Sequence, residues 1–399
     1  MIKPLGWITL LALLLSACEI SVNGEHVKGS GKITTEQRQI GEFDAIENNS
    51  FFDVEVVSGK APALEISGDD NLVPEIETVV ENRTLIVRAK RKSFRFSFSH
   101  HPGTVKVTSV ALNKLSNSGS GDVSVHQYQG GQLTLRLTGA GDISVGGAVG
   151  ALKVYASGSG DLHLQQLQIA QAELELRGAG EAQLNQLSQS MDATVSGSGD
   201  LKVDDIESGQ VRLTMQGPGE VTLRGTIKAL EADTSGSGDL DVQGLKTELA
   251  KVRMSGPGEV RLAGETGQLA LNVSGSGDFD GERLQIDDAQ ISNSGPANLS
   301  FKSIRHGMKA ELSGSGDLEA ELQAAATLEL SMQGSGNATL NGKAKSLTAK
   351  LNGSGDLRAS DLLLDSASIK VTGPGDAEVN VKQAGNPRVV KIDRNGVVH

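Results

Sequence analysis

The segment YASGSGDLHL, residues 155–164, decides the fold, because Gly-Ser-Gly-Asp interrupts an alternation of apolar and polar residues there. Alternation with a period of two is typical of a β-strand that is buried on one face. A glycine-rich tetrapeptide inside such a pattern indicates a turn between two strands. The same interruption returns along most of the chain, so the segment predicts a repeating unit of strand and corner.

The corners recur about every 20 residues, and successive intervals alternate strictly between two lengths that differ by one residue. Their last residues are Asp122, Asp142, Asp161, Glu181, Asp200, Glu220, Asp239, Glu259, Asp278, Asn298, Asp317, Asn337, Asp356 and Asp376. Every second corner is Gly-Ser-Gly-Asp, which gives a longer period of about 39 residues. The structural turn residues assigned at these stricter corners are Gly119, Gly121, Asp122, Gly158, Gly160, Asp161, Gly197, Gly199, Asp200, Gly236, Gly238, Asp239, Gly275, Gly277, Asp278, Gly314, Gly316, Asp317, Gly353, Gly355 and Asp356. Self-similarity at this spacing is the signature of a solenoid.

The looser corners carry a proline in their middle position at Pro218, Pro257, Pro296 and Pro374. Proline fixes φ near about −65° and has no N–H, so this position is expected to make no ladder hydrogen bond, at least at the looser corners. Pro followed by Gly is typical of a type II turn, whose third residue requires a positive φ. We therefore predict that the second glycine supplies this conformation and that the Asp, Glu or Asn after it bonds nearby N–H groups.

Strand-like alternation flanks the corners on both sides, as in Val260 and Leu262 after one corner and Leu269, Leu271 and Val273 before the next. A span of about 20 residues fits one rung of a parallel β-helix, with rungs about 4.8 Å apart. The alternative is a flattened rung of about 39 residues with two corners, which the strict alternation favours. We predict an all-β fold, a right-handed parallel β-helix with the shorter rung, since parallel crossovers are right-handed by default.

The composition limits both the core and the partners. The chain has 399 residues with 50 glycines and 3% aromatic residues, which favours many thin layers over one thick globule. Its formal net charge is −12 at pH 7, so nucleic acid is not expected as a partner. Cys18 is the only cysteine, which excludes an intramolecular disulfide.

Residues 1–18, MIKPLGWITLLALLLSAC, have the order of a secretion signal: positive Lys3, an apolar run from residue 7 to 15, then small residues. The apolar run is too short for a membrane-spanning helix. Leu15-Ser16-Ala17-Cys18 resembles the lipobox of bacterial lipoproteins, which implies cleavage before Cys18 and lipidation of its thiol. By the same resemblance, Glu19 implies sorting to the outer membrane. We therefore expect an outer-membrane lipoprotein that faces the periplasm or the cell surface.

The region before the repeat carries a family resemblance, together with the first corner. The residues that carry it are Phe43-Asp44-Ala45-Ile46, Asp53-Val54, Gly68-Asp69-Asp70-Asn71-Leu72, Leu85-Ile86-Val87 and Ser118-Gly119-Ser120-Gly121-Asp122. They resemble the opening of the head GIN domain, a family described as the adhesin heads of autotransporters. The resemblance covers residues 38 to 380 or so and implies a right-handed β-helical domain at a bacterial surface, with no catalytic residues to transfer.

These features divide the chain into five parts. We expect a signal peptide at 1–17, a lipidated tether at 18–37, an N-terminal β region that caps the solenoid at 38–110, the GSGD repeats at 111–384 and a C-terminal cap at 385–399. Caps are expected because the open end of a β-helix exposes unpaired strand edges. The phenylalanines of the N-terminal region would fill the first rung.

One basic and aromatic cluster is a candidate partner-binding patch. It lies in KRKSFRFSFSHH, residues 90–101, and consists of Arg91, Lys92, Phe94, Arg95, Phe96 and Phe98. Cations beside aromatic rings can bind a glycan, a protein or a membrane surface. The alternative is a hairpin strand whose phenylalanines face the core. His100 and His101 point to opposite faces of a strand, which argues against a shared metal.

The acidic corners allow a calcium hypothesis, because Ca²⁺ prefers oxygen ligands. One carboxylate per corner is few for such a site, and Asn298 and Asn337 interrupt the charges, so we expect structural corners without a metal or cofactor. A phosphate loop is not indicated, because no Lys-Ser or Lys-Thr follows GSGD. Catalysis on a β-helix requires long loops that carry an acid and a base, and the regular spacing leaves no room for them.

The sequence therefore predicts a non-catalytic cell-envelope lipoprotein whose β-solenoid serves as an adhesin, a binding module or a structural module through repeated weak contacts. The alternatives are a calcium-dependent glycan binder, a polysaccharide-active enzyme on a β-helix, and a regulatory docking platform. The expected partners are the membrane, through the lipid anchor, and an envelope protein or glycan.

Overall fold

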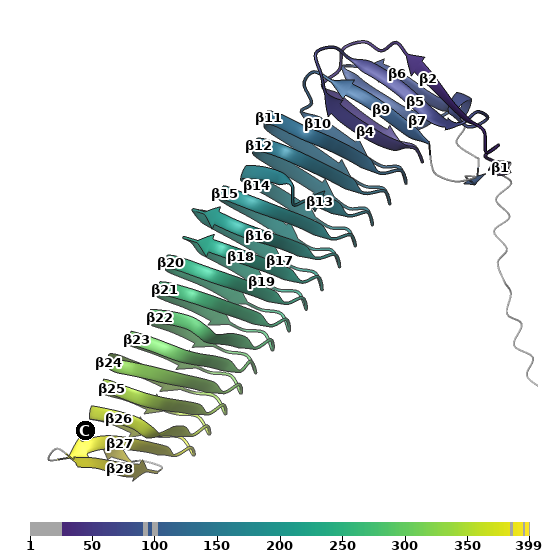
Figure 1. The fold of residues 1–399 in the computed structure, drawn as a ribbon. Coiled ribbons are helices and arrows are strands. Elements are labelled where there is room, and N and C mark those ends of the chain that lie inside the picture. The colour runs from purple at the N-terminus through teal and green to yellow at the C-terminus, as the bar shows by residue number, and fades with distance from the viewer. Residues whose placement is uncertain (1–25, 91–94, 98–102, 384–385, 394–395, 399) are drawn as a thin grey trace, which may run out of the picture.

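The computed structural model describes residues 26–90, 95–97, 103–383, 386–393 and 396–398. These residues form a rod that has the N-terminal strands at one end and the C-terminal strands at the other (Figure 1). The rod is a β-solenoid of about 13 turns built from stacked parallel strands. The expected all-β solenoid is thereby confirmed.

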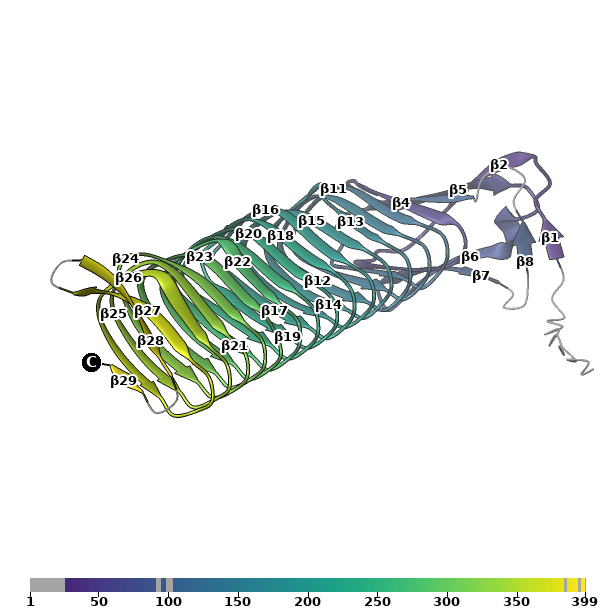
Figure 2. The ribbon, with the colours of Figure 1, turned by 90° about the horizontal axis from the view of Figure 1, so that it is seen from below.

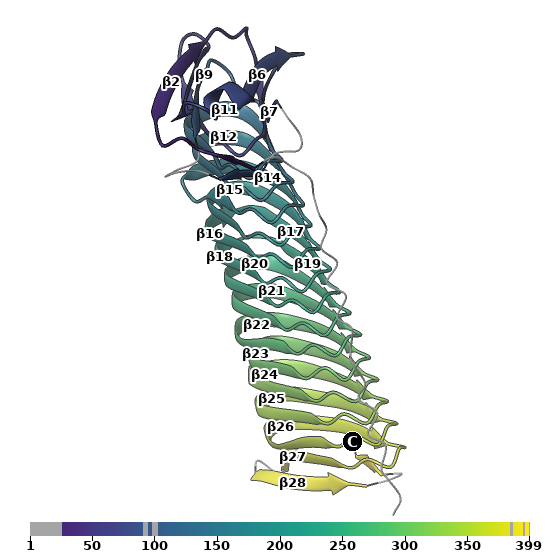
Figure 3. The same ribbon diagram turned by 90° about the vertical axis from the view of Figure 1, so that its right-hand side faces the viewer.

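Each rung runs from one Gly-x-Gly corner to the next, and the rungs stack along the rod (Figures 2 and 3). The strands of the rungs are β11 (Val123–Leu137), β12 (Ile143–Ala156), β13 (Leu162–Leu164), β14 (Leu167–Leu176), β15 (Ala182–Val195), β16 (Leu201–Ser208), β17 (Gln210–Met215), β18 (Val221–Ile227), β19 (Leu230–Thr234), β20 (Leu240–Met254), β21 (Val260–Val273), β22 (Phe279–Asn293), β23 (Leu299–Leu312), β24 (Leu318–Met332), β25 (Ala338–Leu351), β26 (Leu357–Val371) and β27 (Ala377–Gln383). In the ladder, Leu240 pairs with Val260 and Val260 with Phe279. Ladder partners are thus one corner interval apart in the sequence, so the rung is the shorter period and the longer period is two rungs.

The alternation of each strand places one side in the interior of the rod. In β21, the side chains of Val260, Leu262, Leu269, Leu271 and Val273 are at most 2% exposed. Burying one such side chain contributes about 1.5–3 kcal/mol. The core is therefore a set of aliphatic columns, one layer per rung.

The corners are not type II turns, contrary to the prediction. Among the described residues, the glycines with a positive φ are Gly31, Gly147, Gly225, Gly244, Gly264 and Gly342, and none of these is a corner glycine. The corner glycines instead lie over the backbone of the preceding rung. A Cβ on Gly256 would lie 2.0 Å from the Gly236 carbonyl oxygen, and a Cβ on Gly258 would lie 2.1 Å from that of Gly238. Glycine is required because the stacked backbones leave no space for a side chain.

The hydrogen-bond ladder continues through the corners. The Ser159 N–H donates to the Gly139 carbonyl and the Ala140 N–H to the Gly119 carbonyl, both at 3.1 Å. The middle position thus makes a ladder bond at a stricter and at a looser corner, so its predicted freedom from such a bond is not a general property of the corners. At the Pro257 corner, the Gly258 N–H donates to the Gly236 carbonyl at 3.4 Å instead.

The N-terminal strands continue the stack and then reverse direction. They are β1 (His26–Lys28), β2 (Ile33–Arg38), β3 (Ala45–Asn49), β4 (Asp53–Ser58), β5 (Ala63–Asp69), β6 (Ile76–Glu81), β7 (Thr84–Ala89), β8 (Arg95–Ser97), β9 (Thr104–Ser109) and β10 (Lys114–Asn117), with a 3-10 turn η1 (Val73–Glu75). β3 pairs in parallel with β7 and β10, and β4 with β9 and β11. β5 is antiparallel to β9, and β2 is antiparallel to β5. Beyond the first rungs the parallel stack therefore gives way to antiparallel strands, as Figure 2 shows.

The first corner of the stack, Ser50 to Asp53, has the sequence SFFD in place of GSGD. Gly119 lies over the Ser50 carbonyl and Gly121 over the Phe52 carbonyl, so Ser50 and Phe52 occupy the two glycine positions. The Phe52 side chain is fully buried. A Cβ on Gly103 would lie 2.2 Å from the Phe52 ring, so the ring fills the space beside the last parallel strands.

The C-terminal end also reverses direction. β28 (Asn386–Ile392) pairs antiparallel with β27, and β29 (Val397–Val398) pairs antiparallel with β26. Both ends of the parallel ladder are thus covered by antiparallel strands.

Candidate functional site

The acidic residue of each GSGD corner is hydrogen-bonded to the next rung. Asp122 Oδ1 accepts the Asp142 N–H at 2.9 Å, Asp142 Oδ1 accepts the Asp161 N–H at 2.8 Å, and Asp161 Oδ1 accepts the Glu181 N–H at 2.8 Å. Asp53 starts this column by accepting the Asp122 N–H at 2.9 Å. The structure thus brings the predicted turn residues together in one column, in which carboxylates act as ladder acceptors.

Only the shorter side chains make this bond. Asn298 and Asn337 accept the following corner N–H at 3.1 Å, as the aspartates do. The corner residues Glu181, Glu220 and Glu259, all of which the structure describes, accept no such bond from the corner amide of the next rung. Those amides belong to Asp200, Asp239 and Asp278. The extra methylene of Glu moves the carboxylate away from that amide. Sequence reasoning treated the Asp and Glu corners alike, although their alternation was the available signal.

Asp53, the first member of the column, is partly buried, as are Asp142 and Asp161. Burial raises the pKa of the Asp53 carboxyl, and the N–H of Asp122 opposes that rise by stabilising the charged form. In the repeat, each bonded carboxylate has one oxygen engaged by an amide. One remaining oxygen per rung is far fewer than the about six to eight ligands of Ca²⁺, which supports a structural role for the column.

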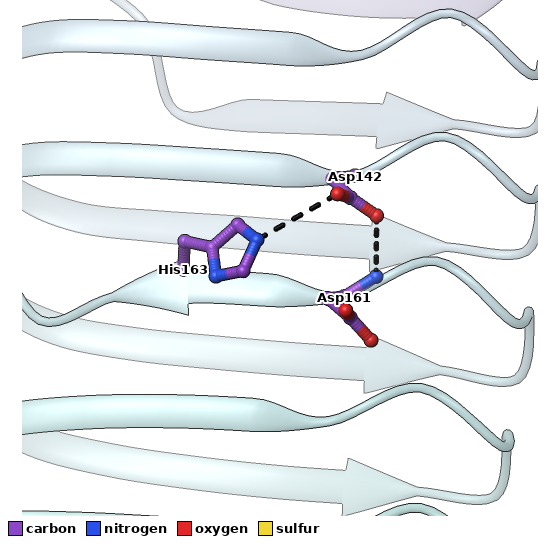
Figure 4. A group of neighbouring side chains, drawn as sticks. All are labelled: Asp142, Asp161 and His163. Atoms are coloured by element: carbon purple, nitrogen blue, oxygen red, sulfur yellow. Dashed lines mark hydrogen bonds and ion pairs between the residues drawn. The ribbon is translucent and has the colours of Figure 1, made fainter.

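One mixed group of potential metal ligands stands out among the described residues: Asp142, Asp161 and His163. One ligand atom from each lies within 4.8 Å of the others, and His163 Nε2 is 3.6 Å from Asp142 Oδ2 (Figure 4). An imidazole beside two carboxylates suits a transition metal better than calcium. The contact between the His163 imidazole and the Asp142 carboxylate accounts for the same arrangement without a metal. Sequence reasoning missed His163, which is the second residue after a GSGD corner.

The predicted basic and aromatic patch lies largely outside the described residues. This applies to Arg91, Lys92, Phe94 and Phe98, and the lipidation residue Cys18 also lies outside them. The backbones of Arg95 and Phe96 are described and belong to β8, which pairs in parallel with β1. The patch and the lipidation therefore stay predictions.

The strand segments that precede the corners form a polar face, which we call the pre-corner face. Its charges pair between neighbouring rungs, with Lys153 2.7 Å from Glu173 and Arg253 3.3 Å from Asp233. A hollow of ≈ 330 Å³ lies on this face where the outward side chains become short, at Ala270 and its neighbours. The face thus combines a regular charge ladder with a local depression. No helix in the described part of the chain is long and apolar enough to cross a membrane.

Several solved structures are similar to this chain at low sequence identity. A putative adhesin from Bacteroides fragilis NCTC 9343 is 18% identical, with 83% of this chain and 99% of that chain covered and a TM-score of 0.23. A putative adhesin from Parabacteroides distasonis ATCC 8503 is 15% identical, with 84% and 99% covered and a TM-score of 0.27. A putative lipid binding protein from the same organism is 16% identical, with 88% and 98% covered and a TM-score of 0.22. No curated protein matches the chain.

The family model described as "Putative auto-transporter adhesin, head GIN domain" matches this chain four times, over residues 42–204, 188–262, 249–319 and 297–390. The matches overlap and run from the N-terminal strands to β28. The resemblance noted from the sequence is confirmed on this ground. The chain belongs to the head GIN domain family.

Proposed function

We propose that this protein is a non-catalytic lipoprotein of the cell envelope whose solenoid serves as an adhesin or binding module. The observation that carries the proposal is the regular rod, in which every rung offers its outward side chains at the same spacing of about 4.8 Å. Contacts that are weak one by one add through effective concentration when they repeat along one rigid surface. The family description, a head domain of adhesins, agrees with this role.

The non-catalytic part of the proposal is supported by the regular connections. From β11 to β27, strands alternate with short corners, and the segments between corners hold strands. Long loops of the kind that carry an acid and a base are therefore lacking between these described strands.

The anchor in this proposal is a lipid on Cys18, which would hold the protein in the outer membrane. Replacing Cys18 with alanine is expected to move the protein from the membrane fraction to the soluble fraction and to abolish labelling by a radioactive fatty acid. An unchanged membrane fraction for Cys18→Ala would remove the anchor from the account.

The binding role is tested by shortening the rod. Deletion of residues 318–356 removes two complete rungs and joins Asp317 to Leu357, which keeps the order of corner and strand. Capture of envelope fractions or cell surfaces by the immobilised protein is expected to weaken with each pair of rungs removed. Capture that is independent of rod length would contradict multivalent binding. Capture that requires calcium and is lost with a chelator would favour the calcium-dependent glycan binder instead.

A further inference from the structure

Two hollows adjoin on the rod between β17 and β23. The larger, of ≈ 700 Å³, is lined in part by Lys228, Lys246 and Lys251. The smaller is the ≈ 330 Å³ hollow of the pre-corner face. Both are lined by Glu231 and Lys251, so they form one continuous depression, which we call the trough.

The larger hollow lies beside the first rungs of the smaller one, and the smaller hollow follows the rod axis. Along its floor and rim, Glu231 pairs with Lys251, Lys251 with Ala270, Ala270 with Gln290, and Gln290 with Lys309. At about 4.8 Å per rung, these four steps span about 19 Å. The shape therefore suits an extended chain that runs along the rod.

One end of the trough is rich in free cations. Within the described part of the chain, Lys228, Lys246 and Lys251 have no carboxylate at ion-pair distance. The other cations of the lining are paired, Arg253 with Asp233 at 3.3 Å and Lys309 with Glu311 at 3.6 Å. Three unpaired lysines in a chain of net charge −12 form a local site for an anionic group.

The other end of the trough is neutral and polar. Asn272, Gln290 and Ser292 line it, and their side chains have no hydrogen-bond partner in the part of the chain that the structure describes. Amides and hydroxyls both donate and accept, as sugar hydroxyls require. This end therefore suits an uncharged sugar.

We propose that the trough binds a linear polysaccharide in which carboxylated sugars alternate with neutral sugars. The three lysines bind the carboxylates as point charges, and the amides bind the neutral sugars. Phosphate and sulfate are recognised best by the arginine fork, and here the Arg253 guanidinium is engaged by Asp233. Glu231 and Glu248 in the lining also repel a densely charged chain. This inference rests on the proposed binding function and names its ligand class.

The test is the affinity of the full-length protein in detergent for three probes, measured by calorimetry at two salt concentrations. Hyaluronan oligosaccharides provide the alternating chain, dextran a neutral chain and heparin a densely charged chain. We expect hyaluronan to bind best, dextran not to bind, and added salt to weaken the hyaluronan complex, because exposed charges are screened.

Two variants with the same change in net charge locate the site. Lys228→Gln, Lys246→Gln and Lys251→Gln together are expected to weaken hyaluronan binding about tenfold or more. The matched control replaces three exposed lysines of β25 in the same way: K343Q, K345Q and K350Q. The control is expected to bind within about twofold of the unmodified protein, and an unchanged circular dichroism spectrum shows that each variant is folded.

Equal losses in the two triple variants would overturn the proposal, because bulk charge would then explain binding. Dextran that binds as well as hyaluronan, or heparin that binds better, would also overturn it. If the protein still captures cell surfaces in a rod-length-dependent way but hyaluronan does not bind, the trough assignment fails while the binding function stands. If surface capture is absent as well, both fail.

Discussion

The first corner of the stack and the second perform the same turn with different residues. Ser50 and Phe52 stand at the positions that Gly119 and Gly121 occupy one rung later, and Asp53 and Asp122 are the acidic residues of the two corners. Gly119 and Gly121 each lie directly over a carbonyl of the corner before them. The first corner carries a large buried side chain instead, which packs against Gly68 and Gly103. The comparison shows that stacking on a preceding corner, rather than the turn itself, requires glycine.

The largest expected effect concerns the side chain that only the first corner carries. Replacing Phe52 with alanine is expected to cost about 3–5 kcal/mol in the free energy of unfolding, because it leaves a cavity in a fully buried site. Denaturant unfolding followed by fluorescence or circular dichroism measures this cost. A cost below about 1 kcal/mol would show that Phe52 does not fill the end of the stack.

The next effect concerns a repeat corner. Gly258→Ala is expected to destabilise the rod by about 3 kcal/mol, because the new methyl group would meet the Gly238 carbonyl oxygen at 2.1 Å. Gly131→Ala is the matched control, because a Cβ there meets nothing within 4 Å. Its expected change is within about 0.5 kcal/mol. Equal effects of the two substitutions on the thermal midpoint would contradict the stacking argument.

A smaller effect separates the two kinds of acidic corner. Asp239→Ala removes the acceptor of the Glu259 N–H and is expected to cost about 1 kcal/mol. Glu259→Ala removes no such bond and is expected to be close to neutral. Glu259 differs from Asp239 in that it also pairs with Arg261, and an ion pair at the surface contributes little to stability. A larger cost for the Glu259 substitution would break the distinction.

The reverse substitution is expected to stabilise the rod. Glu220→Asp shortens a corner side chain so that it can accept the Asp239 N–H, as Asp200 accepts that of Glu220. One added hydrogen bond at an exposed corner is worth about 0.5–1 kcal/mol. Chemical denaturation should therefore show a higher midpoint for Glu220→Asp. A lower midpoint would mean that the longer Glu220 side chain stabilises this corner better than Asp does.

The smallest effect is a pH dependence at the first corner. Because burial raises the pKa of Asp53, the folded protein favours the protonated carboxyl more than the unfolded chain does. Its contribution to stability is complete below the unfolded-state pKa of about 3.9 and is lost as pH rises through the folded-state pKa. Asp53→Asn keeps an acceptor for the Asp122 N–H and does not titrate. The stability of this variant relative to the unmodified protein should rise with pH across that window, whereas a flat difference would contradict the assignment.

The sequence was sufficient to predict the strands and the length of a rung, but not the contacts that the corner residues make. Alternation such as that of Leu269, Leu271 and Val273 predicts which side chains are buried, because the period of a strand fixes them. The glycines were found but explained wrongly, since a close approach between rungs is invisible in local sequence. Buried Asn48 and Asn117 were also missed. Their amides donate to corner carbonyls of their own rung and of the next, which only the stacked structure reveals.

The N-terminal strands were the least predictable part for a related reason. Within the repeat, the pairing partners of each rung can be predicted from the sequence, because each rung pairs with an equivalent rung. The strands β2 to β9 have no such period, and their order mixes parallel pairing at β4 and β9 with antiparallel pairing at β5 and β2. Local alternation cannot distinguish these arrangements, because both bury every second residue.

Residue-resolved amide hydrogen exchange at the corners tests the account most directly. The account predicts an alternation along the rod: the amides of Glu220, Glu259 and Asn298, which donate to an Asp of the preceding rung, exchange slowly. The amides of Asp200, Asp239 and Asp278, which follow a Glu corner, should exchange faster. Uniform exchange rates along the column would contradict the conclusion that the corner aspartates are structural members of the ladder.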